Sequence, residues 1–483
     1  MLQVKKRNGI LVPFDKQRIV NAINKAFIEV DGTLYEEDTA NDIADEIKYS
    51  VKTADKIISV EEIQDMVEDF LMRSERKDVA KTYIRYRYKR EVARSGRDDF
   101  IKAFSEKING TAIENQNANV DEMSFGGRVG AGSDLQMKRY ALDYCVSDMA
   151  RRNHENNEIY IHDLSAYAVG MHNCLSIPFD DLLAKGFNTR QTDVRPAGSV
   201  NTAFQLVAVI FQLQSLQQFG GVSATHLDWT MVPYVRKSFY KHWKDGCRYV
   251  LGIDITKYDG VITSEMPIDL PDYKTFDEVY DYAMDMTIKE VHQAVEGMYH
   301  NLNTLQSRSG NQLPFTSINY GTCTLPEGRM VTKALLDVSI EGLGRLHKTS
   351  IFPCGIFQCM KGVNQKPGDP NYDLFRLALR STATRLYPNY ANVDWSGNAG
   401  YDRNDPRTYF STMGCRTANG WDINHDDGVN GQTKDGRGNI CPVTIIMPTL
   451  AMEATELAAK ENLDNGDYLN DNLVIECFMD LLD

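Results

Sequence analysis

The sequence lacks the patterns that would indicate a membrane protein, a secreted protein or a thiolate zinc site. It contains no run of about eighteen or more apolar residues, and its start, MLQVKKRNG, has no apolar stretch like that of a signal peptide. Its nine cysteines are scattered without a C-x-x-C pair, so neither a disulfide framework nor a four-thiolate zinc site is indicated. We therefore expect a cytoplasmic protein with no metal site in this chain, whose cysteines are mostly buried, reduced thiols.

An excess of basic residues is also missing. The formal net charge is -14, which argues against nucleic acid as a partner, because a surface that binds its backbone needs clustered Lys and Arg. Small nucleotides remain possible, since a few local cations are enough. With 483 residues the chain is too long for one ordinary core, so at least two domains are expected.

The N-terminal segment has clear signals for a short hairpin followed by helices. Asn8-Gly9 favours a type I′ turn between two short strands. Asp15 can then cap a helix, and Ser59 with Glu62 forms a capping-box pattern ahead of another. These signals predict a small module of one hairpin and several helices.

A domain boundary is expected after this module. A further helix is predicted from about Lys77 to about Ala93, and the stretch Ala93-Arg94-Ser95-Gly96-Arg97 divides the chain into domains at 1–96 and 97–483. Helical stretches then alternate with short apolar runs, which indicates an α/β architecture without separating an open sheet from a closed barrel. The clearest of these runs are Glu158 to Ile161, Asn173 to Ile177, Thr316 to Tyr320 and Pro442 to Met447.

The hairpin carries a group of cations. Lys5, Lys6 and Arg7 lie in it, and Arg18 follows one turn into the next helix, so four cations could converge on one small anion. On local pattern alone, a solvated basic edge strand that resists aggregation is the more frequent case.

The wider context favours the nucleotide. The motifs VKKRNG, PF, D-x-x-RI, SVEEIQDMVEDFLM and VAKTYIRYRYKRE follow one another over about residues 1 to 95, and in this order they resemble the ATP-cone domain. The resemblance implies a regulatory site for ATP or dATP, with three cations on the phosphates. ATP cones also occur on a transcriptional repressor, so the module alone does not establish an enzyme. The residues that it implies for this site are Val4, Lys6, Arg7, Phe14, Arg18 and Ile19.

Two cysteines stand out by their surroundings. Cys174 lies in a short apolar run beside His172 and Asn173, and Cys415 follows Gly414 in what reads as a loop. An arbitrary cysteine is most often an inert buried thiol. That alternative stands until the rest of the chain is considered.

From about residue 117 to 483 the sequence resembles the catalytic domain of anaerobic (class III) ribonucleotide reductases. The motifs that carry the resemblance are NANVDEMSFGGR, NEIYIHDLSAY, MHNCLSIP, FGGVSATHLDW, PFTSINYGT, IFPCGIFQ, YPNYANVDW, STMGCRT and DGRGNICPVTIIMP. The resemblance implies a ten-stranded α/β barrel of the type found in glycyl-radical enzymes, with a finger loop through its centre.

The same resemblance implies the reaction and its residues. Cys415 would lose its hydrogen atom to a glycyl radical and then abstract the 3′ hydrogen of a ribonucleoside triphosphate. Cys174 would donate reducing hydrogen from the other side of the ribose, and Asn439 would bind the ribose hydroxyls. Met413 stands where other reductases use a glutamate, which removes a general base and implies formate as the reductant.

Three further segments need an interpretation. Pro314, Phe315, Thr316 and Ser317 offer hydroxyls and amides that could hold the substrate phosphates, or they could belong to a buried strand. The glycines of GGRVGAG fit no nucleotide-binding motif and are interpreted as a turn. His162-Asp163 is expected to be a hydrogen-bonded pair that orders the strand before Cys174.

A complete enzyme of this class would continue past residue 483 to a four-cysteine structural zinc site and the radical glycine. The resemblance also implies a separate activase that cleaves S-adenosylmethionine at a [4Fe–4S] cluster. It further implies a homodimer that could become a tetramer with dATP. The main alternative is an inactive nucleotide-sensing scaffold, and another glycyl-radical enzyme ranks lower.

Overall fold

The computed structural model describes most of the chain as two compact units, residues 1–106 and 107–483. In the part of the chain that is described, every helix is too short or too polar to span a bilayer. The described residues are 2–6, 9–32, 37–53, 57–109, 124–254, 261–398, 400–414, 417–418, 433–465 and 471–482.

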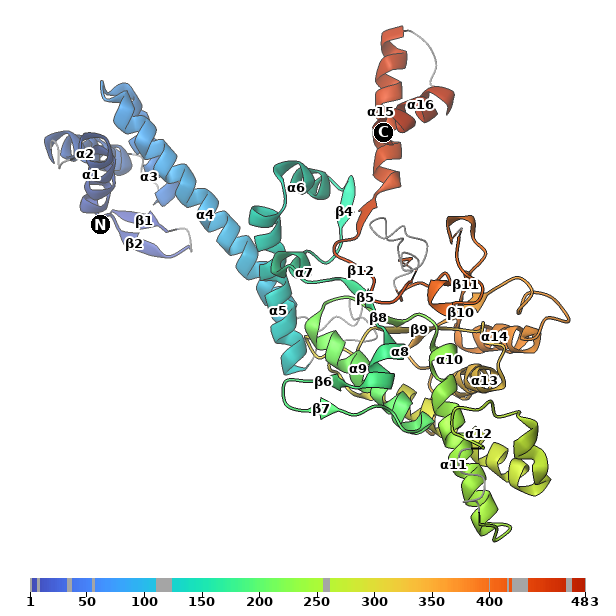
Figure 1. Cartoon of the computed structure of the whole chain (residues 1–483). Coiled ribbons are helices and arrows are strands. Elements are labelled where there is room, and N and C mark those ends of the chain that lie inside the picture. The colour runs from blue at the N-terminus through green and yellow to red at the C-terminus, as the bar shows by residue number, and fades with distance from the viewer. Residues whose placement is uncertain are drawn as a thin grey trace. The chain divides into compact units, whose positions relative to one another are not determined.

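The first unit combines a three-stranded sheet with helices (Figure 1). β1 (Gln3–Lys5) pairs antiparallel with β2 (Leu11–Pro13) and parallel with β3 (Ile58–Ser59), so the predicted hairpin is confirmed. The helices of this unit are α1 (Lys16–Asp31), α2 (Glu37–Thr53), α3 (Val60–Arg73) and α4 (Lys77–Asn109).

Both predicted helix caps are present. The Asp15 side chain accepts a hydrogen bond from the Gln17 N–H at the start of α1. Ser59 and Glu62 exchange side chain to backbone hydrogen bonds at the start of α3. Each bond satisfies an N–H that a helix leaves unpaired at its first turn. The apolar sides of the helices meet in a core whose fully buried members include Ile23, Phe27, Ile47, Ile58 and Leu71.

Helix α4 extends further than the sequence indicated. It was expected to end near Ala93, but it continues through Gly96 to Asn109. A single glycine within a helix costs only about 1 kcal/mol relative to alanine, so flanking residues with good helix propensity can carry the helix past it. The division at 96 lies inside this helix and stays a prediction.

The second unit contains the larger sheet and most of the helices. Its helices of six or more residues are α5 (Phe125–Tyr140), α6 (Asp148–Glu155), α7 (Leu164–Val169), α8 (Phe179–Lys185), α9 (Val200–Gln217), α11 (Val232–Tyr249), α12 (Asp277–Thr304), α13 (Pro326–Glu341), α14 (Tyr372–Arg385), α15 (Met447–Asn465) and α16 (Asp471–Leu482). Its shorter helical segments are η2 (Ala141–Cys145), α10 (Leu227–Thr230), η4 (Pro271–Thr275), η5 (Ser396–Asn398) and η6 (Pro406–Thr408).

The main sheet has the strand order β11-β10-β9-β8-β5-β12 among the described residues. All neighbours are parallel except β12, which runs antiparallel to β5. The predicted α/β architecture is confirmed, with six described strands where the resemblance implies ten for a complete barrel. The six strands are β5 (Cys174–Ser176), β8 (Val222–Ala224), β9 (Thr316–Tyr320), β10 (Cys354–Cys359), β11 (Asn389–Asn392) and β12 (Gly438–Asn439).

Two small sheets accompany it. β4 (Ile159–Ile161) pairs with β13 (Val443–Ile445), and β6 (Phe187–Asn188) pairs with β7 (Asp193–Val194). All four apolar runs singled out in the sequence therefore contain strands.

The two faces of the main sheet have different chemistry. Alternate residues of a strand point to opposite faces. One face packs against α9, α12, α13 and α14 and includes the core residues Val222, Ala224, Ile318, Tyr320 and Phe357. The opposite face, which we call the inner face, is buried but largely polar. It carries Cys174, Ser176, Ser223, Ser317, Asn319 and Gln358.

The glycines of GGRVGAG are not a turn, as the sequence interpretation had it, but lie in helix α5. A side chain at Gly126 would overlap Asn311, and one at Gly130 would meet the Gly310 backbone at 2.9 Å. The glycines thus allow the helix to approach residues 310–311 closely, a tertiary cause that local pattern does not reveal.

Candidate active site

Cys174 and Asn439 lie together on the inner face. They are paired residues of β5 and β12, and the Cys174 N–H donates to the Asn439 side-chain oxygen at 2.8 Å. The Cys174 side chain is 2% exposed, and the N–H of Gly221 points at its sulfur from 3.3 Å. The structure therefore brings together two of the four residues predicted for catalysis.

Of the other two, Met413 follows residues 410–412, which contact the inner face. Met413 is buried, and its N–H donates to the carbonyl of Thr417 at 3.0 Å. The amide of Asn439 donates to the Thr417 hydroxyl at 3.2 Å. Cys415 lies outside the described residues. Asn439 thus links Cys174 to a residue two positions after Cys415.

Sequence reasoning missed three inner-face side chains that contact this segment. Ser223, Asn319 and Gln358 hydrogen-bond to the backbone of Phe410 and Thr412. The available signal was a polar residue between apolar neighbours in a buried strand, which requires a hydrogen-bond partner.

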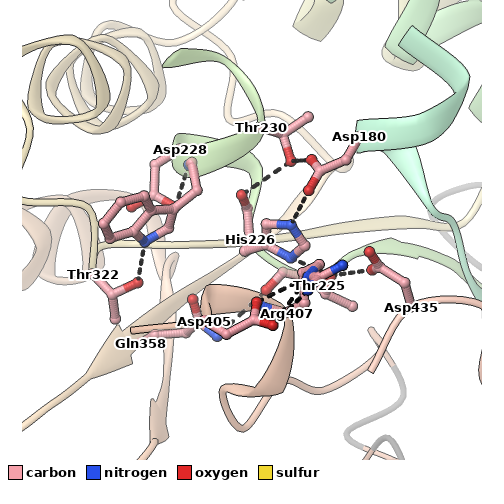
Figure 2. A network of polar contacts seen from close by, with 11 residues as sticks. Asp180, Thr225, His226, Asp228, Thr230, Thr322, Gln358, Asp405, Arg407 and Asp435 are labelled. Atoms are coloured by element: carbon pink, nitrogen blue, oxygen red, sulfur yellow. Dashed lines mark hydrogen bonds and ion pairs between the residues drawn. The ribbon is translucent and has the colours of Figure 1, made fainter. Parts of the chain in front are cut away.

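A second polar cluster missed by sequence reasoning lies at the carboxyl ends of β5 and β8 (Figure 2). The Asp180 carboxylate is 2.9 Å from Nε2 of His226 and accepts from the Thr230 hydroxyl at 2.6 Å. On the other side of the ring, Nδ1 of His226 is 2.7 Å from the Thr225 hydroxyl, which also contacts Asp435. The result is a continuous chain Asp180–His226–Thr225–Asp435.

Counting hydrogens shows that this chain holds an additional proton. Its three hydrogen bonds need three protons, but a neutral histidine and a threonine hydroxyl supply one each. The third proton must therefore make His226 cationic or protonate one of the two carboxyl groups. With a neutral His226 and two ionised carboxylates, one of the three hydrogen bonds in the series Asp180–His226–Thr225–Asp435 would lack a hydrogen.

The pKa shifts indicate where this proton resides. Burial alone would lower the pKa of His226, but the hydrogen bond to Asp180 and the surrounding carboxylates raise it overall. Burial alone would raise the pKa of Asp180, but its bonds to His226 and Thr230 lower it overall. Burial raises the pKa of Asp435. These directions favour an ionised Asp180 and place the additional proton on His226 or Asp435.

The same cluster has the residue types of a metal site but not the arrangement. Ligand atoms of Asp180, His226 and Asp435 lie within 4.8 Å of one another. However, the Asp180 carboxylate is hydrogen-bonded to Nε2 of His226, whereas Asp435 reaches the Nδ1 side only through the Thr225 hydroxyl, so these groups already serve one another as hydrogen-bond partners. The geometry favours a shared proton over a metal ion.

Residues predicted for the ATP-cone site are distributed between the core and the surface of the first unit. Val4 and Ile19 are buried in its core, and Phe14 packs against that core. Lys6 is half-buried and Arg18 is exposed, with its Nε 3.3 Å from an Asp15 carboxylate oxygen. Arg7 lies outside the described residues. The nucleotide site in this module stays a prediction.

The segment predicted to hold the substrate phosphates divides between the two faces of β9. Phe315 lies against Gly221 and Gly414, whose lack of side chains makes room for its ring. Thr316 faces the core, whereas Ser317 faces inward, and neither hydroxyl has a hydrogen-bond partner among the described residues. The role of Pro314 to Ser317 in phosphate binding stays a prediction, and Ser317 is its best-placed member.

His162 and Asp163 do not pair with each other as expected. Nε2 of His162 lies 2.7 Å from the Thr444 hydroxyl. The Asp163 carboxylate instead accepts from the Asn173 amide at 2.7 Å. Asp163 therefore supports the residue before Cys174, while His162 joins β4 to β13.

These features define an α/β protein with a buried, polar inner face that carries a cysteine and an asparagine. Comparison with known proteins agrees with this class. Residues 116–469 match the family model of "Anaerobic ribonucleoside-triphosphate reductase", and residues 2–92 match that of the ATP cone domain. The chain belongs to the anaerobic ribonucleoside-triphosphate reductase family.

Curated relatives bear this family name. The chain is 30% identical to the anaerobic ribonucleoside-triphosphate reductase of Haemophilus influenzae over 93% of its own length and 59% of the relative's. The Escherichia coli protein is also 30% identical, with 93% and 58% covered. The chain thus spans less than two thirds of these relatives. A solved structure of the anaerobic ribonucleotide reductase from Thermotoga maritima in complex with dATP and CTP aligns with a TM-score of 0.45 and 12% identity, covering 74% of this chain and 55% of that one.

Proposed function

We propose that the protein containing this chain reduces ribonucleoside triphosphates to deoxyribonucleotides by radical chemistry, with Cys415 and Cys174 as its two reacting thiols. The observation that carries the proposal is the placement of Cys174 beside Asn439, which reaches Thr417, two residues after Cys415. Family membership supports the same reaction.

The chemistry needs thiols in particular. A sulfur atom exchanges a hydrogen atom readily and reversibly, whereas a hydroxyl holds its hydrogen too strongly. Cys415 gives its hydrogen atom to a glycyl radical elsewhere in the protein and becomes a thiyl radical. It then takes the 3′ hydrogen of the ribose, and Asn439 holds the ribose hydroxyls in position.

The remaining steps balance with formate as reductant. The 3′ hydroxyl loses its proton, and the 2′ hydroxyl takes up a proton and leaves as water. Cys174 then gives a hydrogen atom to the 2′ carbon, and its thiyl radical takes the hydrogen atom of formate. The remaining formate electron and a proton reduce the 3′ ketone to a 3′ radical, to which Cys415 returns the hydrogen atom. Overall, the ribose loses one oxygen as water, while formate and one proton supply two hydrogens and leave carbon dioxide. Met413 favours this route because a thioether cannot act as the general base that a glutamate provides.

Regulation and partners follow from the family and the first unit. We propose that the ATP cone binds ATP or dATP as an effector and that the enzyme is a homodimer, with a tetramer possible in dATP. It requires the radical S-adenosylmethionine activase with its [4Fe–4S] cluster, and the part that supplies the radical glycine and the structural zinc. Nucleic acid is not expected as a partner, and the cytoplasmic location stays a prediction.

The test is an anaerobic assay of CTP reduction with activase, S-adenosylmethionine, reductant, formate and ATP. We expect product when this chain is combined with a C-terminal segment that carries the radical glycine. Replacement of Cys174 or Cys415 by Ser should abolish product while ATP binding remains. Cys247→Ala is the matched control, because Cys247 is a buried cysteine in the separate core of α11 and α12 and should leave turnover unchanged.

Turnover in Cys174→Ser or Cys415→Ser would refute the mechanism. If the wild-type mixture yields no product although ATP binds, the chain is an inactive nucleotide-sensing scaffold rather than a reductase. Release of labelled carbon dioxide from formate would test the reductant separately.

A further inference from the structure

Three strands of the main sheet each send one buried polar side chain to the segment just before Cys415. The residues are Ser223 in β8, Asn319 in β9 and Gln358 in β10, and all are fully buried on the inner face. A polar side chain in such a place is costly unless its hydrogen bonds are made. The hydrogen-bond partners of these three side chains therefore indicate what role the side chains have.

Asn319 makes the most complete set of contacts. Its side-chain oxygen accepts from the Thr412 N–H at 3.2 Å, and its Nδ2 donates to the Thr412 carbonyl at 3.0 Å. One side-chain amide thus pairs with both backbone groups of one residue, as a neighbouring strand would. The same Nδ2 also donates to the Ala224 carbonyl at 2.9 Å, which ties Asn319 to β8.

The other two side chains extend this contact along the segment. Nε2 of Gln358 donates to the Phe410 carbonyl at 2.9 Å, and the Ser223 hydroxyl donates to the Thr412 carbonyl at 3.3 Å. Beyond them, the Met413 N–H bonds to Thr417. The sheet thus holds the backbone at Phe410 and Thr412, two alternate positions of the segment that crosses it.

This arrangement solves a specific physical problem. Residues 410–412 cross the buried inner face outside the ladder of the main sheet, and each buried N–H or carbonyl left without a partner costs about 1 to 3 kcal/mol. Side-chain amides can provide those partners and, because each comes from a rigid strand, they also fix the position of the segment.

We propose that Asn319 is a positioning residue for Cys415, assisted by Gln358 and Ser223. These residues hold residues 410–412 against the sheet so that the thiol that follows meets the substrate in a reproducible position. The inference rests on the proposed function in one respect, namely that Cys415 carries the reacting sulfur. Hydrogen-atom transfer depends steeply on distance, and a misplacement of about 1 Å can cost about 100-fold in rate.

The first experiment measures positioning without activity. Amide hydrogen exchange is followed in this chain for wild type, Asn319→Asp and Asn371→Asp. In Asn319→Asp one carboxylate oxygen can still accept from the Thr412 N–H, but the other replaces the donor to the carbonyls of Thr412 and Ala224 and repels them. The segment should therefore loosen, and exchange at residues 412–413 should be faster. Asn371 is the matched control, because it is also fully buried and donates to the carbonyls of Gly321 and Cys323. Its variant should leave exchange at residues 412–413 unchanged.

The second experiment measures catalysis in the full-length enzyme. Asn319→Asp should lower kcat for CTP reduction by about 100-fold, with the KM for CTP and the glycyl radical content by electron paramagnetic resonance unchanged. Gln358→Met keeps the size of the side chain and removes its hydrogen bonds to the carbonyls of Phe410 and Thr225. It should lower kcat less. This second variant keeps the test informative if Asn319→Asp does not fold.

The outcomes are separable. Wild-type exchange at residues 412–413 in a folded Asn319→Asp protein, or wild-type kcat in both variants, would overturn the positioning role. An equal rise in exchange at residues 412–413 in Asn371→Asp would also overturn it, since the change would then reflect general destabilisation. If the wild-type full-length enzyme makes no deoxyribonucleotide, the proposed function fails, while the exchange experiment still decides whether Asn319 holds the segment.

Discussion

The two faces of the main sheet are both buried but have opposite chemistry. In β8, Val222 and Ala224 pack against helices, while Ser223 between them faces inward. In β9 the same alternation places Ile318 in the core and Asn319 on the inner face. On the helix side, nondirectional apolar packing fixes the strands. On the inner face, directional hydrogen bonds from the same strands fix residues 410–412.

This difference separates stability from function. Burial of apolar side chains on the outer face supplies most of the folding free energy, because polar groups gain little net energy when they exchange water for a protein partner. The polar side chains of the inner face can therefore serve to position the segment before Cys415 rather than to stabilise the fold. Substitutions on the outer face should change stability, and those on the inner face should mainly change chemistry.

The largest expected effect on stability comes from the outer face. Phe211 in α9 is fully buried and meets Phe179 at a ring distance of 5.1 Å. Phe211→Ala should lower the free energy of unfolding by about 3 to 5 kcal/mol, because the cavity left behind cannot fully collapse. Urea unfolding measures it. Leu216→Ala in the same helix is the control, since Leu216 is 60% exposed and should change stability by less than about 0.5 kcal/mol. Equal effects of the two variants would contradict the assignment of this face as the core.

Sequence patterns predicted contacts between residues that are close in the sequence and missed contacts between residues that are far apart in it. The caps at Asp15 and Ser59 join residues two and three positions apart, and both are confirmed. The contact of Cys174 with Asn439 spans 265 positions, and only the family resemblance suggested that both belong to one site.

The residues that were missed show the limit of such reasoning. Asn319 and Thr412 are 93 positions apart, and Thr225 and Asp435 are 210 apart. No local pattern relates them, because the sheet brings them together only after the chain has folded. The glycines of α5 were misinterpreted for the same reason, since their close approach to residues 310–311 is a tertiary contact.

The next prediction concerns the charge of the polar cluster Asp180–His226–Thr225–Asp435 at the carboxyl ends of β5 and β8. His226→Gln keeps two hydrogen-bonding groups but cannot accept a proton. Hydrogen bonds that involve a charged group contribute about 1.5 to 3 kcal/mol, so the variant should lose stability of this order near pH 6. His226 contacts Asp180 and the Thr225 hydroxyl, and the carboxylates of Asp228, Asp435 and Asp405 also act on it electrostatically.

The loss should depend on pH in a defined direction. The folded pKa of His226 is raised above its usual 6.5, so its contribution is full below pH 6.5 and disappears as the pH rises through the raised value. Asp180 has a lowered pKa and stays ionised down to below its usual 3.8. The stability difference between wild type and His226→Gln should therefore be large near pH 6 and smaller near pH 9. His300→Gln serves as the control, because the His300 side chain is 45% exposed and lies outside this cluster. A difference that grows with pH would show that His226 is neutral in the folded protein.

The smallest expected effect lies in the first unit, where stability depends on a contact between near neighbours. Ser59→Ala removes the oxygen that accepts from the Glu62 N–H at the start of α3. It should lower the free energy of unfolding of this unit by about 1 kcal/mol, because one N–H of the first helical turn loses its partner. The change is measured by thermal unfolding of residues 1–106 within the full chain, with hydrogen exchange in α3 as the readout. Ser59→Asp should restore most of it, since a carboxylate also caps a helix. A loss of several kcal/mol that Asp does not restore would mean that Ser59 acts through long-range packing with β1, and that the contrast between local and long-range contacts fails in this unit.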